Sequence, residues 1–416
     1  MSDAPELLTP TVAIIGGGPA GLSAARKLAR SVDGEVLVLD REKQAGGIPR
    51  HAAHPGYGIR DRKRFMSGPK YAKVLVEEAT SAGAIIRTRA MVTGWVDDDT
   101  LVATTPQGRV HIRPKVFCFA TGARERPRPA RMIPGTRPGG VLTTGQLQNL
   151  VHLNHEKVGT RAVVVGAELV SWSAVMTLAE SGCRTEALIS AFPRGEAYPV
   201  FTGPGSVAFR THVETNSRVV AIHGRGRVTG VEIEDASGRR KVIECDTVVF
   251  TGDWVPDNEL LRMAGIKLDD VSLAPVVDGA MRTSKAGVFA VGNLNHPVET
   301  ADVVALEGEY VADRIIEHLR GKADPTAEVR LVVNDPIRWI SPSVLVPGDP
   351  QPARGRLVGW VDRFIPRPVV TVTQDGRQVG RKRLWWSAAP GRAFRIPTSM
   401  FSGVDAAGGD VDISIE

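Results

Sequence analysis

The sequence has few cysteines and few aromatic residues, and each shortage excludes a class of chemistry. Its 416 residues include 3 cysteines, and Phe, Trp and Tyr together make up 5%. Cys118, Cys183 and Cys245 lie far apart and form no CxxC or CxxxxC pair. A local redox disulfide, a zinc site and an iron–sulfur cluster therefore lack a ligand set, and we expect no bound metal. Three isolated thiols beside apolar residues indicate buried side chains in a reducing cytoplasm.

Long hydrophobic runs and blocks of like charge are also missing. No apolar stretch reaches the ~18 residues that a membrane span requires, so we expect none. The start of the chain, with Asp3 and Glu6, lacks the charge pattern of a signal peptide. The formal net charge of +6 is spread over the whole chain. Because Asp61 interrupts the densest basic stretch, Arg60 to Arg64, the sequence predicts no nucleic-acid partner.

The chain does contain a strand, a glycine-rich turn, a helix and a second strand near its start. Residues 11–15 form a continuous apolar run that is typical of a buried parallel strand. The turn reads Gly16-x-Gly18-x-x-Gly21, and Asp40 ends the next strand. Gly16 allows the tight turn, Gly18 lets a pyrophosphate approach the backbone, and Gly21 lets the helix pack against the strand. The helix start supplies free N–H groups to phosphates, and Asp40 can accept hydrogen bonds from ribose hydroxyls.

The same pattern begins again near Thr160. Residues 161–165 read as a strand followed by Gly166, residues 173–179 as a helix, and residues 184–189 as another strand. Further along, Ser237-Gly238 and Asp375-Gly376 separate alternating runs and predict hairpin turns. The sequence therefore predicts two nucleotide-domain-like units, followed by a small, mainly β domain.

Three later motifs resemble those of flavoproteins with two dinucleotide-binding domains. Ala120-Thr121-Gly122-Ala123 follows an apolar strand, as the motif that closes the first half of their FAD domain does. Thr251-Gly252 is similar to the second such junction. Residues 287–293 resemble their last motif, a strand that ends in Gly-Asp, although Asn293 replaces the acid. The resemblance implies that FAD is the cofactor and that the amide of Asn293 hydrogen-bonds the ribityl chain.

In that family, the helix after the last motif points its amino terminus at the flavin ring. The corresponding helix here is expected over residues 299–319, with Thr300 and Ala301 in its first turn. The positive end of a helix dipole at this place stabilises a reduced, anionic flavin. Plain domain packing is the alternative role for this helix.

A narrower resemblance covers roughly residues 10–320. Gly46 to His51, His54-Pro55 and Gly68-Pro69 resemble the FAD-containing α-type subunits of hydrogen cyanide synthase, opine oxidase and dye-linked amino-acid dehydrogenases. This resemblance implies a second flavoprotein subunit as partner. Many members of the group carry an additional C-terminal cysteine cluster, which this chain lacks. An iron–sulfur centre, if the complex has one, then belongs to a separate small subunit.

The expected fold class is α/β, with two Rossmann-like domains and a small β domain. We expect the first half of the FAD domain over residues 8–155 and an inserted NAD(P)-like domain over 156–270. The second half of the FAD domain follows over 271–322, and the C-terminal β domain over 326–416. The predicted cofactor-binding residues are Gly16, Gly18, Pro19, Ala20, Gly21, Asp40, Arg41, Gly46, Gly47, Ile48, Val92, Thr121, Gly122, Gly292, Asn293, Thr300 and Ala301.

The second glycine motif departs from the pattern of a nucleotide site. It reads Gly166-Ala167-Glu168-Leu169-Val170-Ser171, with Glu168 at the second glycine position and Ser171 at the third. A side chain at the second position blocks a pyrophosphate, and a carboxylate also repels it. We therefore expect the second unit to keep the fold and to have lost or weakened NAD(P)H binding.

Histidines and tryptophans give weaker indications. His51 and His54 lie in the loop expected beside the flavin, where an imidazole moves protons or binds a substrate carboxylate. They are weak catalytic candidates, because holding the loop or lining an interface is the alternative. Trp385 and Trp386 are expected on opposite faces of a strand, one in the core and one at a subunit contact.

Three functions remain open from the sequence. The first is the electron-transferring subunit of a heteromeric FAD dehydrogenase that acts on an amino acid, an imino acid or an opine. The second is a stand-alone NAD(P)H-dependent FAD reductase, which requires that Glu168 is tolerated. The third is a scaffold subunit with a structural FAD.

Overall fold

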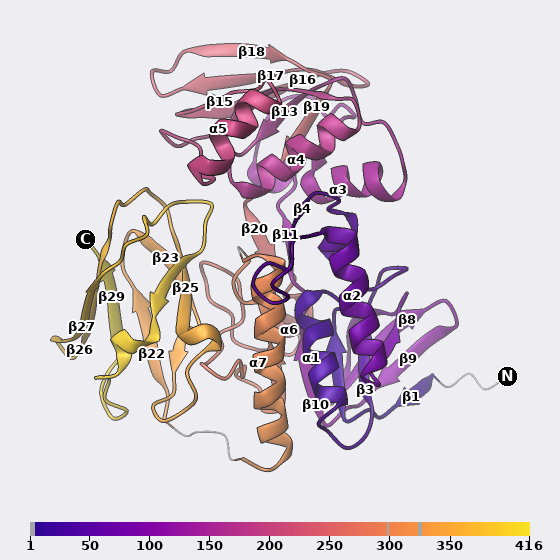
Figure 1. Ribbon diagram of the computed structural model, residues 1–416, viewed down its shortest axis with the longest axis vertical. Coiled ribbons are helices and arrows are strands. Elements are labelled where there is room, and N and C mark those ends of the chain that lie inside the picture. The colour runs from indigo at the N-terminus through magenta and orange to yellow at the C-terminus, as the bar shows by residue number, and fades with distance from the viewer. Residues whose placement is uncertain (1–4, 298, 323–326) are drawn as a thin grey trace.

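The computed structural model describes residues 5–297, 299–322 and 327–416. The ribbon forms three units, and the C-terminal unit lies beside helix α7 (Ala301–Leu319) of the first unit and below the second unit (Figure 1). This arrangement confirms the α/β class and the two Rossmann-like units that the sequence predicts. The boundary expected between residues 322 and 326 falls at residues 323–326, which lie outside the described residues.

A five-stranded parallel sheet forms the centre of the first unit. Its order is β21-β10-β2-β3-β6, with β2 (Val12–Ile15), β3 (Val36–Leu39), β6 (Ile85–Arg87), β10 (Val116–Phe119) and β21 (Val288–Ala290). Strands β21, β10, β2 and β3 are buried along their whole length, as parallel strands covered on both faces should be. The covering helices are α1 (Pro19–Ala29), α2 (Gly68–Ser81) and α7. A second sheet, in the order β1-β9-β8-β7, packs onto the same core with β1 (Glu6–Leu8), β7 (Met91–Asp97), β8 (Thr100–Thr105) and β9 (Gly108–Ile112).

The strand register brings distant parts of the chain to one edge. Ile15 lies opposite Leu39 and Phe119, and Phe119 lies opposite Ala290. All four are the last residues of parallel strands, so the loops that follow them emerge together. The edge between β2 and β10 is also where the chain changes direction across the sheet, which is the usual ligand crevice of such folds.

The second unit repeats this plan around another parallel sheet. Its order is β12-β19-β13-β14-β15, with β12 (Val141–Thr143), β13 (Arg161–Val165), β14 (Arg184–Ile189), β15 (Val213–Glu214) and β19 (Thr247–Phe250). Its helices are α3 (Thr144–Gln148), α4 (Leu169–Glu180) and α5 (Pro199–Ala208). An antiparallel sheet of β16 (Ser217–Gly224), β17 (Val228–Asp235) and β18 (Arg240–Glu244) contains the predicted turn at Ser237-Gly238. A two-stranded link, β11 (Ala123–Glu125) with β20 (Trp254–Pro256), joins the two units, and α6 (Glu259–Met263) follows it.

The start of the second unit lies upstream of the expected boundary at residue 156. Strand β12 pairs with β19 of the second sheet, and α3 packs against α4. Residues 141–148 therefore belong to the second unit, which corrects the boundary. Three residues of strand are too few to show a period, so only the pairing reveals where they belong.

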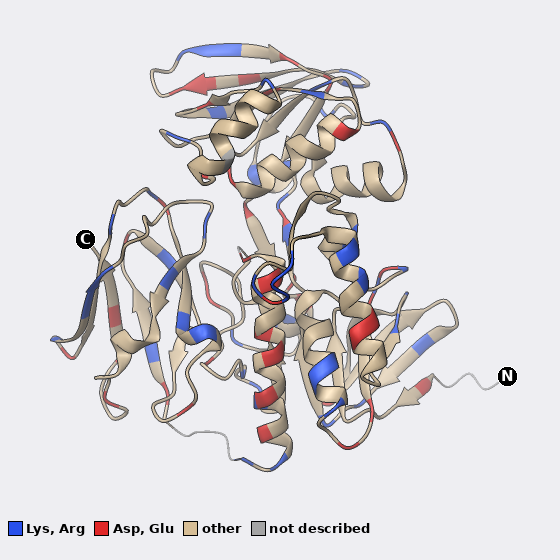
Figure 2. Ribbon diagram, in the orientation of Figure 1, with Lys and Arg blue, Asp and Glu red and all other residues tan. Residues whose placement is uncertain are grey.

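The C-terminal unit is built from two sheets around its own core. The five-stranded sheet has the order β24-β22-β29-β26-β27, with β22 (Val329–Val333), β24 (Val344–Leu345), β26 (Val369–Gln374), β27 (Arg377–Arg383) and β29 (Val411–Ile415). The other contains β23 (Ile337–Ser341), β25 (Arg356–Val361) and β28 (Phe394–Pro397). The predicted hairpin at Asp375-Gly376 joins β26 and β27. Strand β27, at the outer edge of this unit, contains several Lys and Arg residues, which are blue in the ribbon of Figure 2.

The expectation for the tryptophan pair was wrong. Strand β27 ends at Arg383, so Trp385 and Trp386 follow it and are 85% and 78% exposed. Leu384 takes the core position instead, with 6% exposure. Because β27 ends before the tryptophans, the alternation of side chains between the two faces of the strand does not place either indole in the core.

Helices α1 and α7 approach each other unusually closely in the first unit. A methyl group built on Gly308 of α7 would lie 2.1 Å from the carbonyl oxygen of Ala20 in α1. Ion pairs of α1 with α7, such as Lys27–Asp313 at 2.6 Å, extend the contact along both helices. Only a residue without a side chain permits this packing.

We expect Gly308→Ala to lower the free energy of unfolding by about 1–3 kcal/mol, because the new methyl group must push the two helices apart. Denaturant unfolding measures the change. The matched control is Gly145→Ala in α3, where the nearest atom to the new methyl group is a carboxylate oxygen of Glu125 at 3.7 Å, an ordinary contact distance. A helical Gly→Ala change without a clash should raise stability by about 0.5–1 kcal/mol. Equal effects of both substitutions would contradict the packing argument.

Candidate functional site

The turn after β2 lies at the carboxyl edge of the first sheet, where open α/β sheets bind their ligands, and we call this place the first crevice. A methyl group on Gly16 would lie 2.3 Å from the carbonyl oxygen of Ala120, and one on Gly21 would lie 2.0 Å from that of Gly16. Both glycines are therefore required by close backbone contacts. Pro19 occupies the first position of α1, and Ala20 packs near Gly292, whose added methyl group would lie 3.0 Å from the Ala20 side chain.

Gly18 differs from its neighbours because it faces open space. The nearest protein atom to a methyl group built on it is the Cα of Gly47, at 3.9 Å. Gly18 is the N-cap of α1, and no side chain caps the helix. Among the described residues, the backbone N–H groups of Gly18, Ala20 and Gly21 have no acceptor. An uncapped helix start with free N–H groups in front of a bare backbone fits a diphosphate.

Asp40 follows β3 and lies beside the same turn. One of its carboxylate oxygens accepts a hydrogen bond from Gly17 N at 3.0 Å, and the other from Glu42 N at 2.8 Å. Burial raises the pKa of this carboxyl group. A ribose hydroxyl would share these oxygens with the backbone, because each oxygen has a second lone pair. The neighbouring Arg41 turns outward and forms an ion pair with Asp257 at 3.3 Å.

The loop after β3 packs directly on the glycine turn. The N–H of Gly46 donates to the carbonyl of Gly17 at 2.7 Å, and a methyl group on Gly47 would lie 2.9 Å from the Cα of Gly18. Ile48 begins a short 3-10 helix and is 56% exposed. Val92 lies on β7, opposite Ala103, and packs against the core of the first unit.

The loop between β21 and α7 is held by Asn293. Its Nδ2 donates to the carbonyl of Glu299 at 3.0 Å, and its Oδ1 accepts from Glu299 N at 3.1 Å. The amide thus closes the turn that leads into α7, and one N–H of it remains for a ligand hydroxyl. Thr300 is the N-cap of α7, and no side chain caps this helix either.

The first turn of α7 contains Asp302, which forms an ion pair with Arg60 at 3.1 Å. The hydroxyl of Thr300 donates to Asp302 at 2.5 Å, and Asp302 also accepts from the backbone N–H of Arg60 at 2.9 Å. The N–H of Ala301 has no acceptor among the described residues. Two helices therefore present free N–H groups at the same edge of the sheet.

Thr121 and Gly122 lie at the junction of the first two units. The Thr121 hydroxyl donates to the carbonyl of Asp257 at 2.7 Å, and Gly122 has a positive φ of 76°. The crevice thus brings together residues from the turn after β2, the loop after β3, this junction and the start of α7. Arg41 and Val92 make their described contacts elsewhere.

His51 and His54 occupy different environments. His51 is 5% exposed, and its Nδ1 lies 3.2 Å from Oε1 of Gln148 in the second unit. Gln148 in turn donates to Ser173 at 2.8 Å, so the contact joins the two units. The Nδ1 of His54 lies 2.9 Å from the carbonyl of Pro55. Burial lowers the pKa of both imidazoles, which favours their neutral forms.

The equivalent crevice of the second unit is filled by side chains. Glu168 is the N-cap of α4 and is 7% exposed. Its carboxylate lies 2.6 Å from a methyl group built on Gly166 and 2.9 Å from one built on Gly252. Ser171 forms a hydrogen bond with Thr251 at 2.7 Å, across the place where the third glycine would be. The carboxylate therefore sits where a pyrophosphate would approach the backbone.

Two further carboxylates lie near Glu168. Glu125 and Glu196 are 9% and 6% exposed, and burial raises the pKa of each to about 7, with the Glu168 charge adding to the effect. Glu196 accepts a hydrogen bond from Ser190 at 3.0 Å. The second crevice is thus acidic, whereas a pyrophosphate is an anion.

The C-terminal unit covers this second crevice. A methyl group on Gly391 would lie 2.9 Å from the side chains of both Glu168 and Glu196. Phe364 of the same unit meets the guanidinium of Arg194, which lies 4.1 Å from its ring centre. The sequence did not predict these contacts of Gly391 and Phe364, because no local pattern indicates a contact between units.

Two arginines of the C-terminal unit complete the contact. The guanidinium of Arg392 lies over the ring of Tyr198, 4.5 Å from its centre. Arg395 makes two hydrogen bonds to the buried carboxylate of Glu299, at 2.8 and 2.6 Å. The C-terminal unit therefore binds both to the second unit and to the loop before α7.

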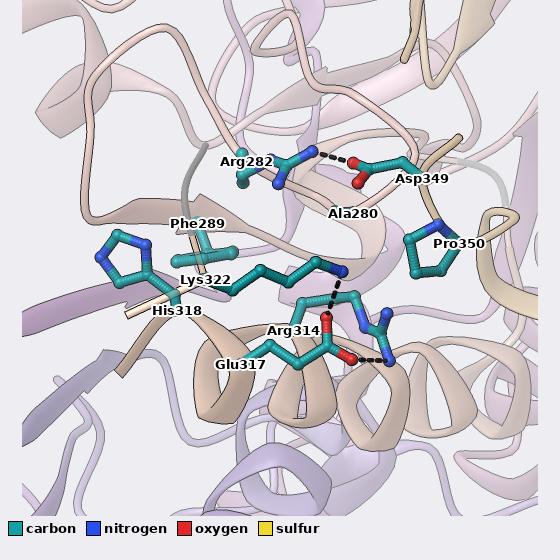
Figure 3. Close-up of a pocket in the computed structure, with 9 residues that line it drawn as sticks. All are labelled: Ala280, Arg282, Phe289, Arg314, Glu317, His318, Lys322, Asp349 and Pro350. Atoms are coloured by element: carbon teal, nitrogen blue, oxygen red, sulfur yellow. Dashed lines mark hydrogen bonds and ion pairs between the residues drawn. The ribbon is translucent and has the colours of Figure 1, made fainter. Parts of the chain in front are cut away.

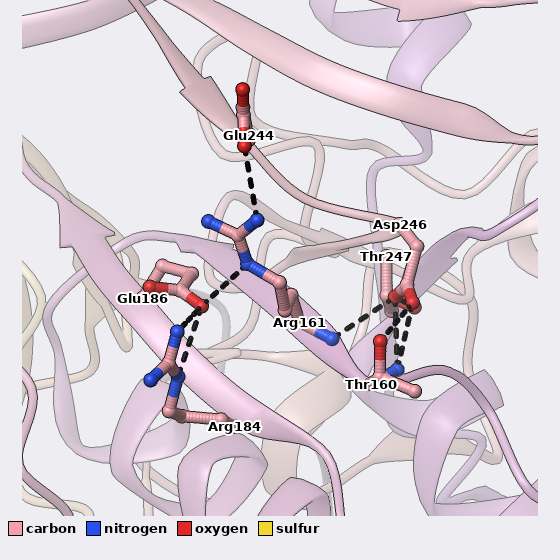
Figure 4. A network of polar contacts seen from close by, with 7 residues as sticks. All are labelled: Thr160, Arg161, Arg184, Glu186, Glu244, Asp246 and Thr247. Atoms are coloured by element: carbon pink, nitrogen blue, oxygen red, sulfur yellow. Dashed lines mark hydrogen bonds and ion pairs between the residues drawn. The ribbon is translucent and has the colours of Figure 1, made fainter.

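Two clusters of charged side chains away from the crevices are held by internal ion pairs. A pocket at the carboxyl end of α7 contains Arg282 paired with Asp349, and Glu317 paired with Arg314 and Lys322 (Figure 3). The polar network in Figure 4 joins Thr160, Arg161, Arg184, Glu186, Glu244, Asp246 and Thr247 at the amino ends of β13, β14 and β19. That edge is opposite the crevice, so we assign the network to the stability of the second unit.

The raised pKa of Glu196 makes stability depend on pH. A folded-state pKa of about 7, above the ordinary 4.5, stabilises the fold below pH 4.5, and this stabilisation is lost as the pH rises through 7. Glutamine does not ionise, so the Glu196→Gln variant does not lose this stabilisation. Between pH 5 and 8, the free energy of unfolding of the variant should therefore rise relative to that of the unaltered protein, by up to roughly 3 kcal/mol. Denaturant unfolding at several pH values measures the difference. Glu156→Gln, at an exposed glutamate, is the control, and a pH-independent difference for Glu196→Gln would contradict the assignment.

Comparisons with known proteins agree with this architecture. The sequence profile of the pyridine nucleotide-disulphide oxidoreductase family matches residues 10–308. A ferredoxin–NADP reductase of Ignicoccus hospitalis is 26% identical over 306 residues, which are 72% of this chain and 94% of that protein. A sarcosine oxidase subunit alpha of Corynebacterium sp. is 26% identical over 364 residues, and this chain covers 80% of its own length but 35% of that subunit.

Solved structures share the fold at low sequence identity. The thioredoxin reductase of T. acidophilum superposes with a TM-score of 0.63 at 24% identity, covering 75% of this chain and 99% of that one. The L-proline dehydrogenase of P. horikoshii gives a TM-score of 0.57 at 19% identity, covering 78% of this chain and 58% of that one. Since the family profile spans both nucleotide-binding units, the chain belongs to the pyridine nucleotide-disulphide oxidoreductase family.

Proposed function

We propose that this oxidoreductase holds FAD in its first unit and is the electron-transferring subunit of a heteromeric dehydrogenase. Its electrons then come from a substrate-oxidising partner subunit instead of a free nicotinamide. The filled second crevice is the observation that carries the proposal: Glu168 occupies the pyrophosphate position, and the C-terminal unit covers it through Gly391.

The first crevice supports FAD as the ligand. Gly18 and the start of α1 would hold the diphosphate, Asp40 the adenosine ribose, and Asn293 the ribityl chain. The free N–H of Ala301 would face the ring and stabilise negative charge on it. When bound, FAD would supply the hydride-accepting ring, and the residues of this chain position it and set its electrostatics.

The cysteines give no alternative route for electrons. Cys118, Cys183 and Cys245 are all buried and free. Burial raises the pKa of each thiol to about 12, so none of them is a reactive thiolate at neutral pH. Electron exchange through a disulfide of this chain, as the family name suggests, therefore has no structural basis here.

The substrate class rests on resemblance. Sarcosine oxidase and L-proline dehydrogenase are named for oxidations of amino acids, and both contain a chain of related sequence or fold. An amino acid, an imino acid or an opine, oxidised on the partner subunit, is therefore the proposed substrate. A second flavoprotein subunit is the proposed partner, and a small iron–sulfur subunit would supply any cluster.

A stand-alone NAD(P)H-dependent reductase is the second candidate. The coverage of 94% of a ferredoxin–NADP reductase favours it, because that protein is matched almost end to end. This function requires the side chain of Glu168 and the Gly391 loop to leave the second crevice. A scaffold role with a structural FAD differs from both candidates, because its flavin would exchange no electrons with a partner.

Gly18→Val tests the FAD site separately from the fold. The Cβ of the new side chain lies no closer than 3.9 Å to any protein atom outside its chain neighbours, so we expect the variant to fold with little change in its melting temperature. It should lose bound FAD, because valine fills the position of the diphosphate. Flavin absorbance after gel filtration measures retention. Gly226→Val, which also faces open space, should retain the flavin. A Gly18→Val protein that stays yellow with an unchanged spectrum means that the site is misplaced.

Anaerobic reduction distinguishes the two leading functions. We expect dithionite to bleach the flavin and neither NADH nor NADPH to do so, because the second crevice is filled. After copurification with its partner, the flavin should be reduced by one amino acid, imino acid or opine in a dye-reduction screen. Rapid bleaching by NADH or NADPH would instead establish the stand-alone reductase. A flavin that dithionite reduces but no substrate of the complex does would favour the scaffold role.

A further inference from the structure

The C-terminal unit exposes an aromatic pair that the crevices do not use. Trp385 and Trp386 are 85% and 78% exposed, whereas tryptophan is normally well buried. Leu384, directly before them, is anchored in the core of the unit. The two indoles are thus presented to solvent at a fixed place on the surface.

Basic side chains line the strand that leads to this pair. Arg377, Lys382 and Arg383 of β27 are exposed, and none of them has an ion-pair partner among the described residues. Arg381, on the same strand, is paired with Glu416 at 3.2 Å. β27 is the last strand of its sheet.

We name Arg377, Lys382, Arg383, Trp385 and Trp386 the Trp–Arg edge. We propose that the Trp–Arg edge binds a protein partner with an acidic surface around an apolar pocket. Tryptophan and arginine are the residue types that dominate binding energy at protein interfaces. Lys382 and Arg383 come shortly before the two exposed indoles in the chain, and Arg377 lies at the other end of β27. These unpaired cations match carboxylates placed around a pocket that receives the rings.

Two other occupants fit the edge less well. A second copy of this chain would bring the same three unpaired cations, and like charges oppose such an interface. An anionic membrane surface would also meet the exposed carboxylates of Asp412, on β29 in the same sheet, and of Glu416, directly after that strand. An extended anionic membrane would be repelled by these carboxylates, whereas a protein of limited contact area can bind the Trp–Arg edge without touching them.

The inference goes beyond the proposed function, because it depends on neither FAD nor the second crevice. It concerns a binding surface, so a measurement of affinity tests it without any redox assay. Failure of one conclusion therefore leaves the other standing.

The experiment uses the full chain and three variants. The first variant is Trp385→Ser with Trp386→Ser, and the second replaces Arg377, Lys382 and Arg383 by glutamine. The control replaces Lys70, Arg109 and Arg225 by glutamine, which removes the same charge from exposed positions elsewhere. Proteins that copurify with the unaltered chain from its own cells are identified by mass spectrometry, produced separately, and titrated against each variant.

We expect a partner whose contact surface is acidic, and hydrogen exchange of residues 377–386 should slow in the complex. The tryptophan variant should bind the partner at least tenfold more weakly than the unaltered chain. The variant with three glutamines in β27 should bind more weakly at low salt, and its affinity should depend much less on the salt concentration. The control should bind with unchanged affinity. Recovery of the chain alone or as a homo-oligomer would overturn the proposal. So would unchanged affinity of the tryptophan variant, or binding of the chain to phosphatidylglycerol vesicles through the same tryptophans.

Discussion

The close contact between α1 and α7 determines the geometry of the first crevice. Gly308 lets α7 lie against the backbone of Ala20, next to the start of α1. Gly308 is seven residues into α7, so at 1.5 Å per residue the start of α7 lies roughly 10 Å beyond the contact. The two helix starts are therefore staggered along one edge of the sheet. Such a stagger places two separate patches of free N–H groups along an extended ligand.

The second unit shows that the same topology need not make the same site. Both sheets bring a turn, a helix start and neighbouring loops to their carboxyl edge. In the first unit, backbone without side chains faces the crevice at Gly18, while in the second Glu168 fills it. The C-terminal unit then covers the acid and also binds Glu299 through Arg395. One small unit thus contacts the second crevice and the loop beside the first, which ties the two nucleotide units together.

The sequence predicted the parts of this structure that local patterns determine. Continuous apolar runs predicted the buried strands, and the glycine spacing predicted a turn whose glycines the close contacts of Gly16 and Gly21 require. The presence of Glu168 at the second glycine position predicted that a side chain, instead of exposed backbone, lies at the start of α4 in the second unit. Two expected ligand contacts proved to have protein partners as well: both oxygens of Asp40 accept backbone hydrogen bonds, and Asn293 closes a turn.

Contacts between distant segments were beyond the reach of sequence patterns. Strand β12 was assigned to the wrong unit because its three residues show no period, and its partner β19 lies about a hundred residues away. The contact of Gly391 with Glu168 could not be predicted from the local sequence. Glycine is common in polar loops because turns require it, so its presence there does not indicate a contact between units. Burial of Glu125 and Glu196 likewise follows from the docked units and not from their neighbours in the chain.

These constraints together limit how electrons can enter and leave the protein. The buried thiols exclude a disulfide relay within the chain, and the filled crevice opposes a nicotinamide on the second unit. The ion pair of Glu299 with Arg395 joins the C-terminal unit to the loop before α7, whose start lies at the first crevice. Under the proposed function, exchange must therefore occur across a protein–protein contact. Under the same proposal, the second unit serves as a rigid support, because removing it would also remove the contacts of Glu168 and Glu196 with Gly391 that hold the C-terminal unit in place.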